Sequence, residues 1–164
     1  MRVALALALT LSVGTTSIAH AQNPPATVPH SNAVQIFTSK DIAAKGDSLP
    51  AGASAFKWLV QWDGLATMVS RRDSSGIPER HEQFGDIFVV QRGHARLVSG
   101  GTTEGERSVS AGEWRGGTIR GGTEAELSAG DVVVIPPGIP HQVLLPPGER
   151  FHYFVFKVAK PAAK

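Results

Sequence analysis

Cysteine is absent from the 164 residues of this chain. No disulfide can form, so the stability of the fold has to come from packing or from a bound metal. A strong excess of one charge is also lacking, because 16 Lys and Arg residues nearly balance 14 Asp and Glu residues. The formal net charge of +2, without a basic run, gives no support for nucleic-acid binding.

Long apolar runs are missing apart from one at the N-terminus. Arg2 precedes the apolar residues 3–13, and residues 19–21 (Ala-His-Ala) form a small-x-small cleavage site. This pattern predicts a signal peptide over residues 1–21, and a periplasmic or secreted mature protein that is not bound to a membrane. A membrane anchor is the alternative, but a span needs about 20 apolar residues and this run is shorter.

Helix signals are also few. Residues 22–33 are rich in proline and polar side chains, which predicts an extended tail. Residues 34–164 are long enough for one domain with a single core. Within that domain the sequence predicts one short helix, with Ser39 as its N-cap and Gly46 as its stop.

Short strand-like segments make up most of the remaining chain. Asp63-Gly64 is a strong signal for a hairpin turn between two of them. Later segments are separated by Arg92-Gly93, by Gly130-Asp131 and by the Pro-Pro-Gly turn at residues 146–148. Many short strands with glycine and proline turns predict an all-β fold, either a sandwich or a barrel.

Residues 100–122 are rich in glycine and could link two domains. The strand pattern resumes with the same short spacing, however, and neither half alone could bury a core. The sequence therefore predicts a long loop or an irregular hairpin within one domain. Trp114, Arg115 and Arg120 are predicted to be surface residues of this segment. The alternative is that they line the mouth of a site and attract an anionic or aromatic substrate.

Carboxylates and histidines gather at the ends of two predicted strands. Glu79 and His81 are two positions apart, so their side chains leave the same face of a strand. Asp86 begins the apolar strand that follows. His141 opens another strand after Pro-Gly at residues 137–138, a pair that suits a type II turn. A polar, solvated strand end is the alternative interpretation of Glu79, His81 and Asp86.

Two spacings resemble the conserved motifs of the cupins. Four residues separate His81 from Asp86 and six separate Asp86 from Gly93, as in the first cupin motif. Gly130, five residues, Pro-Pro-Gly, two residues and His141 resemble the second. The chain also resembles a group of small exported bacterial cupins with a Glu-x-His, a following Asp and a segment like residues 112–116. The resemblance implies a single cupin-type jelly-roll β-barrel with a short N-terminal helix.

The resemblance also implies a metal site, because cupins typically hold a divalent ion with three first-motif residues (His, His and Glu) and one second-motif His. Glu79 falls where the first His usually lies, His81 is the second His, Asp86 replaces the Glu, and His141 is the second-motif His. Such a mixed nitrogen and oxygen set suits Mn, Fe or Zn. Asp86 is one methylene shorter than Glu, which leaves open whether it binds the metal directly, reaches it through water or orients His81.

The implied function is that of a metal-dependent enzyme acting on a small molecule, with dioxygenase and isomerase chemistry both left open. One alternative is a non-catalytic periplasmic module that binds a small molecule or a metal. Another is a metal-free, epimerase-like cupin in which His81 and Asp86 form an acid–base pair. Homodimer formation is implied by the resemblance alone.

Two features of the last predicted strand stay open. The alternation of the strand does not decide whether His152 enters the cavity as a further ligand or substrate contact. Phe151, Phe154 and Phe156 are predicted to belong to the core or to a dimer face, not to a substrate pocket.

Overall fold

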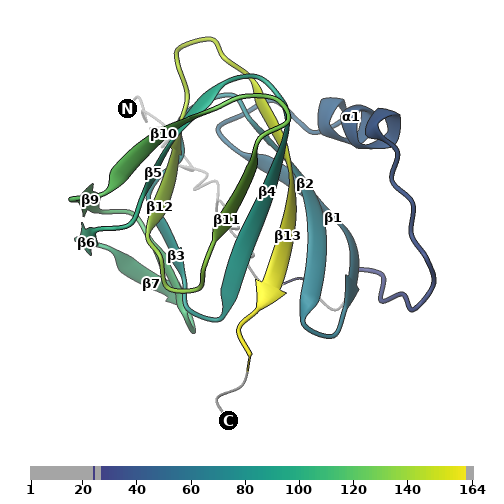
Figure 1. The fold of residues 1–164 in the computed structure, drawn as a ribbon, viewed down its shortest axis with the longest axis horizontal. Helices are drawn as coiled ribbons and strands as arrows, with labels where there is room; N and C mark the ends of the chain where they lie inside the picture. Colours follow the sequence, from purple (N-terminus) through teal and green to yellow (C-terminus); the bar gives the residue numbers. More distant parts are fainter. Residues whose placement is uncertain (1–23, 25–26, 162–164) are drawn as a thin grey trace, which may run out of the picture.

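Two β-sheets face each other around one core in the computed structural model, which describes residue 24 and residues 27–161 (Figure 1). The helix α1 lies against the outer side of one sheet. The predicted signal peptide, residues 1–21, lies outside the described residues. Among the residues that are described, no helix is long and apolar enough to cross a membrane.

The elements follow one another along the chain as α1 (Ser39–Asp47), β1 (Ala55–Trp62), β2 (Leu65–Arg72), β3 (Glu79–His81), β4 (Phe84–Arg92), β5 (Ala95–Ser99), β6 (Thr102–Glu104), β7 (Arg107–Ser110), β8 (Glu113–Arg115), β9 (Thr118–Arg120), β10 (Thr123–Leu127), β11 (Val132–Ile135), β12 (His141–Leu144) and β13 (Phe151–Ala159). The first sheet has the strand order β1-β2-β13-β4-β11, and the second has the order β10-β5-β12-β3-β8-β7. Strands β6 and β9 form a small separate ladder.

Consecutive strands mostly lie in different sheets. The predicted turns after β4, β10 and β12 each carry the chain from one sheet to the other. At the first of these crossings Gly93 has a φ of +86°, and a Cβ there would overlap the carbonyl oxygen of Arg150. This repeated crossing is typical of a jelly roll and confirms the all-β prediction. Within the described residues the two sheets stay separate and do not close into one hydrogen-bonded barrel.

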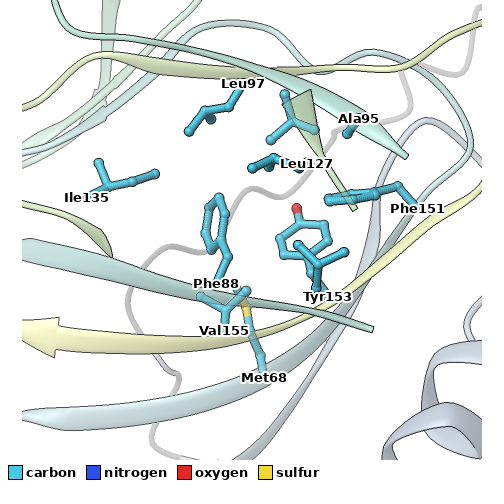
Figure 2. Close-up of a cluster of buried hydrophobic side chains, with 11 residues drawn as sticks. Met68, Phe88, Ala95, Leu97, Leu127, Ile135, Phe151, Tyr153 and Val155 are labelled. Carbon is cyan, nitrogen blue, oxygen red and sulfur yellow. The ribbon is translucent and has the colours of Figure 1, made fainter. Parts of the chain in front are cut away.

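The core fills the space between the two sheets. Phe88 of β4 and Tyr153 of β13 pack with their ring centroids 5.0 Å apart, and side chains of the second sheet such as Leu97 lie opposite (Figure 2). Burial of each large apolar side chain contributes about 1.5–3 kcal/mol. The buried cluster consists of Met68, Phe88, Val90, Ala95, Leu97, Leu127, Ile135, Val143, Phe151, Tyr153 and Val155.

Helix α1 begins one residue earlier than the sequence predicted. Thr38 is the N-cap: its hydroxyl accepts a hydrogen bond from the amide of Asp41, and the Asp41 carboxylate accepts one from the amide of Thr38. This reciprocal pair is a capping box, which Ser39 could not form with the same partner. The helix also continues past Gly46 to Asp47. The prediction that the helix ends at Gly46 is therefore wrong.

The outer face of β13 packs against this helix. A Cβ added at Gly46 would lie 2.9 Å from Nδ1 of His152, so glycine allows the close approach of helix and sheet. His152 is buried there and does not enter the space between the sheets. Phe151 lies in the core, as predicted, whereas Phe154 packs beneath Phe37 on the outer face, 6.3 Å between ring centroids.

The segment before the helix is extended. The amide of Gln61 in β1 donates to the carbonyl of Pro29, and the amide of Ser31 donates to the carbonyl of Gln61. Val28 is buried by this pairing. Part of the predicted tail thus runs along the edge of the first sheet.

The glycine-rich residues 100–122 form a nested, irregular hairpin. β6 pairs with β9, and β7 pairs with β8. β8 also pairs with β3, so the hairpin belongs to the same domain, which confirms the prediction. The consequence for the site is that two side chains of β8, Glu113 and Arg115, are carried into the interior.

Candidate metal centre

Strand register brings the predicted site residues together. β3 lies between β12 and β8, with Glu79 opposite His141 on one side and opposite Arg115 on the other. His81 follows two positions later on the same face. Asp86 enters from the facing sheet, on β4. All four predicted residues are buried in the interior, although whether each is a metal ligand stays a prediction.

Three of the four converge closely. One ligand atom each from Glu79, His81 and His141 lies within 4.8 Å of the others. Nε2 of His81 is 3.7 Å from Oε2 of Glu79, and the two imidazole rings are 5.2 Å apart between centroids. Bonds of about 2.0–2.2 Å place two ligands of one ion roughly 3–4 Å apart. The set therefore needs little contraction to hold a metal.

Each histidine is fixed through its Nδ1. Nδ1 of His81 lies 2.7 Å from Oε2 of Glu113, and Nδ1 of His141 lies 3.1 Å from the carbonyl oxygen of Ile139. A carboxylate or carbonyl on the other ring nitrogen is typical of metal-binding histidines. Nε2 of His81 is buried and has no hydrogen-bond partner in the described part of the chain. A metal would satisfy this nitrogen, so the residues fit such an ion.

Two arginines hold the carboxylate of Glu79. Nη2 of Arg72 donates to Oε1 at 2.9 Å, and Nη2 of Arg115 lies 3.6 Å from Oε2. Burial alone would raise the pKa of Glu79, but Arg115 and Arg72 hold that pKa well below its ordinary value. Glu79 is therefore an anion at any physiological pH.

Asp86 is paired with a lysine instead. Nζ of Lys157, a fully buried side chain, lies 2.7 Å from Oδ1 of Asp86. Oδ2 of Asp86 is 3.4 Å from Nε2 of His81 and 3.8 Å from Nε2 of His141. Burial alone would raise the pKa of Asp86, but Lys157 and His81 hold it well below its ordinary value. Asp86 lies beside the converging three and outside their set.

The two histidines differ in their affinity for protons. Burial and the neighbouring His81 lower the pKa of His141 to about 4, so its imidazole is neutral at pH 7. Burial alone would lower the pKa of His81 as well, but the neighbouring carboxylates of Asp86 and Glu113 raise it. A metal at Nε2 of His81 would thus compete with a proton.

Sequence reasoning missed several residues of the interior. The prediction that Arg115 lies on the surface is wrong: only 2% of it is exposed, because β8 pairs with β3 and turns Arg115 toward Glu79. The spacing Glu-x-Arg at residues 113–115 repeats that of Glu79-x-His81, a signal that both side chains share one face. Trp114, between them, is half-buried and donates to Glu82 at 2.9 Å. Arg120 is exposed, as predicted.

A small cavity borders these groups. Its volume is about 30 Å³, room for a few water-sized atoms. Glu79, His141, Arg72 and Tyr153 all line it. Nε of Arg72 donates to the Tyr153 hydroxyl at 2.9 Å. The cavity therefore places hydrogen-bond donors beside two of the three converging residues, Glu79 and His141.

Comparisons with known proteins bear on the fold. No family model and no curated protein matches the sequence. Among solved structures, a double-stranded β-helix protein from Klebsiella pneumoniae has a TM-score of 0.56 at 16% identity, over 80% of this chain and 95% of that one. A Bacillus halodurans protein has a TM-score of 0.59 at 13% identity, over 84% and 89% of the two chains. The cupin domain of Cnp3 from Schizosaccharomyces pombe has a TM-score of 0.52 at 10% identity, over 70% and 66%.

The chain has the cupin fold. This confirms the architecture implied by the two sequence motifs. Identities this low show the fold alone, so the chemistry of this chain has to be argued from its own residues.

Proposed function

We propose that this cupin binds one divalent metal ion, Mn, Fe or Zn, through Glu79, His81 and His141, and that it is an enzyme acting on a small molecule. The observation that carries the proposal is the convergence of three buried ligand atoms within 4.8 Å, one of them the unpartnered Nε2 of His81. Two imidazoles and one carboxylate leave coordination positions open for a substrate.

The surrounding residues prepare this site. Glu113 and the Ile139 carbonyl hold the two rings with Nε2 toward the interior, and the arginines keep Glu79 ionised. A metal held there would supply Lewis-acid chemistry, polarising a substrate oxygen or lowering the pKa of a bound water. The site is buried between the two sheets, so bulk water is excluded and the electrostatic interactions within the site are strengthened.

A second candidate needs no metal. Each interior carboxylate already has a cationic neighbour: Arg72 for Glu79, Lys157 for Asp86 and Arg115 for Glu113. His81 lies between Asp86 and Glu113 and holds its proton more readily than a free imidazole. His81 and Asp86 would then transfer a proton to and from the substrate as an acid–base pair.

Elemental analysis of freshly purified protein separates the candidates. The metal proposal expects about one divalent ion per chain, and loss of that ion in His141→Ala. His94→Ala is the matched control, because His94 is exposed and its ring nitrogen Nδ1 lies 3.2 Å from the hydroxyl of Ser128, outside the interior. Full metal content in His141→Ala would contradict the assignment. Turnover of a small-molecule substrate that survives exhaustive chelation would favour the metal-free candidate, in which His81 and Asp86 act as an acid–base pair.

We also propose that the protein is exported. The charged start, the apolar run and the small-x-small site of residues 1–21 support this proposal. Mass spectrometry of protein expressed with its own N-terminus should find a mature chain beginning at Gln22. An intact chain that still begins at Met1 would contradict it.

A further inference from the structure

Opposite charges are balanced in the interior before any metal binds. Three buried cations, Arg72, Arg115 and Lys157, are matched by three buried carboxylates, Glu79, Asp86 and Glu113. With both imidazoles neutral, as they have to be when they bind a metal, the formal charge of these side chains is zero. A divalent ion would therefore bring two positive charges that no protein group compensates. Uncompensated charge in a buried site is unfavourable, so a metal-loaded interior favours the entry of an anion.

The cavity places hydrogen-bond donors where such an anion would contact the metal site. Glu79 and His141 border the cavity, and so do Arg72, Ser70 and Tyr153. The guanidinium of Arg72 has five N–H donors. Its bonds to Glu79 and Tyr153 use two of them. Arginine recognises carboxylates especially well because its planar fork matches their two oxygens.

The remaining walls limit the shape of the ligand. Phe56, Met68, Phe88 and Val143 line the same cavity, so a ligand there meets apolar side chains as well as polar ones. An anion with oxygens on every side would leave some of them unpaired there. The volume of about 30 Å³ admits only a few heavy atoms without rearrangement.

We infer that the ligand of this cupin is a small carboxylate, with its oxygens between the metal and Arg72 and a short apolar end toward Phe88. The inference rests on the metal binding proposed above and names the substrate class of the same site. Metal and carboxylate reinforce each other here, because each neutralises charge that the other introduces.

Calorimetry with acetate and acetamide tests the inference. The two molecules have nearly the same shape, and only acetate is charged. Metal stoichiometry is measured first by titrating Mn²⁺ or Zn²⁺ into chelator-treated protein. Acetate should then bind the metal-loaded protein roughly tenfold or more tightly than acetamide, as expected for hydrogen bonds to a charged group. Equal affinities would overturn the inference, and benzoate binding as tightly as acetate would overturn its size limit.

Arg72→Met is the decisive variant. It should weaken acetate binding roughly tenfold or more and still bind the metal, because Glu79 loses a competing cation. Arg71→Met is the matched control: Arg71 is the neighbouring residue, and its side chain pairs with Asp73 instead of pointing into the cavity. Unchanged acetate affinity in Arg72→Met would overturn the role of Arg72. If that variant does not fold, the comparison of acetate with acetamide on the wild-type protein still decides.

The effect of acetate on metal affinity distinguishes failure of the carboxylate inference from failure of the proposed metal site. Acetate should raise the affinity for the metal by the same factor by which the metal raises the affinity for acetate. If the metal binds and acetate has no effect on its affinity, the carboxylate inference fails and the metal site stands. If no metal binds at all, the proposed metal site fails, and the carboxylate inference fails with it.

Discussion

His81 and His152 are both buried, and in the described part of the chain neither has a hydrogen-bond partner for its Nε2. Their surroundings differ. His81 has the carboxylates of Glu113, Asp86 and Glu79 within 2.7–3.7 Å. His152 has one carboxylate nearby, that of Asp47 at 3.9 Å. An unpartnered buried nitrogen is therefore no metal site by itself; the convergence of further ligand atoms makes His81 the candidate.

The largest expected effect is on metal binding. His81→Ala should lower the affinity for Zn²⁺ by about 100-fold or more, since even residues behind the ligands typically contribute 10–100-fold. His152→Ala should leave that affinity within about twofold of wild type. Competitive titration against a fluorescent chelator measures both. Equal losses in the two variants would erase the distinction between the two histidines.

Next comes the group behind His81. Glu113→Gln keeps the size of the side chain and removes its charge, so Nδ1 of His81 loses a charge-assisted partner. We expect the affinity for Zn²⁺ to fall by roughly 10–100-fold. Asp47→Asn, the corresponding change beside His152, is the control and should have no effect. A Glu113→Gln variant with wild-type affinity would show that Glu113 does not orient the ligand.

In the metal-free protein, His152 and His81 should make the free energy of unfolding depend on pH in opposite directions. Burial lowers the pKa of His152 in the folded protein. As the pH falls, the unfolded chain therefore takes up this proton first, and the folded state loses stability from about pH 6.5 down to the folded-state pKa. The pKa of His81 is raised despite its burial. Its contribution is therefore present below about pH 6.5 and lost as the pH rises through the folded-state value.

Urea unfolding with a chelator present, between about pH 5 and pH 8, checks these signs. His152→Phe should reduce the loss of stability on the acid side. His81→Gln should instead reduce the loss on the alkaline side. If both variants keep the wild-type pH profile, neither histidine titrates as the structure implies.

The smallest expected effect concerns the outer face alone. Gly46→Ala places a Cβ 2.9 Å from Nδ1 of His152. Overpacking costs about 1–3 kcal/mol, and the better helix propensity of alanine returns about 1 kcal/mol. We expect a net loss of about 1 kcal/mol in the free energy of unfolding, with metal affinity unchanged. His152→Ala in the same chain should relieve the loss; if it does not, the two residues are not in contact.

Local patterns were sufficient for part of the site. The two-residue spacing of Glu79 and His81 and the Pro-Gly turn before His141 both predict side chains that enter the interior, and the structure has them there. The all-β class followed equally from turn residues. These features depend on a few neighbouring residues, and the sequence displays them directly.

The rest depended on contacts between distant segments. Arg115 enters the interior because β8 pairs with β3, some thirty-six positions earlier in the chain, at the Glu79↔Arg115 register. Lys157 meets Asp86 only through the pairing of β13 with β4. A glycine-rich segment gives no local sign of its partner strand, and a lone lysine gives no sign of its carboxylate. The counter-charges of the site were therefore missed, whereas the four predicted residues Glu79, His81, Asp86 and His141 do lie in the interior.

The most direct test of the metal site is anomalous diffraction from crystals of the protein loaded with Zn²⁺. We expect a single strong peak about 2.0–2.2 Å from Nε2 of His81, Nε2 of His141 and an oxygen of Glu79. A peak elsewhere, for example beside the exposed His30 and Asp63, or no peak between the sheets at saturating metal, would contradict it.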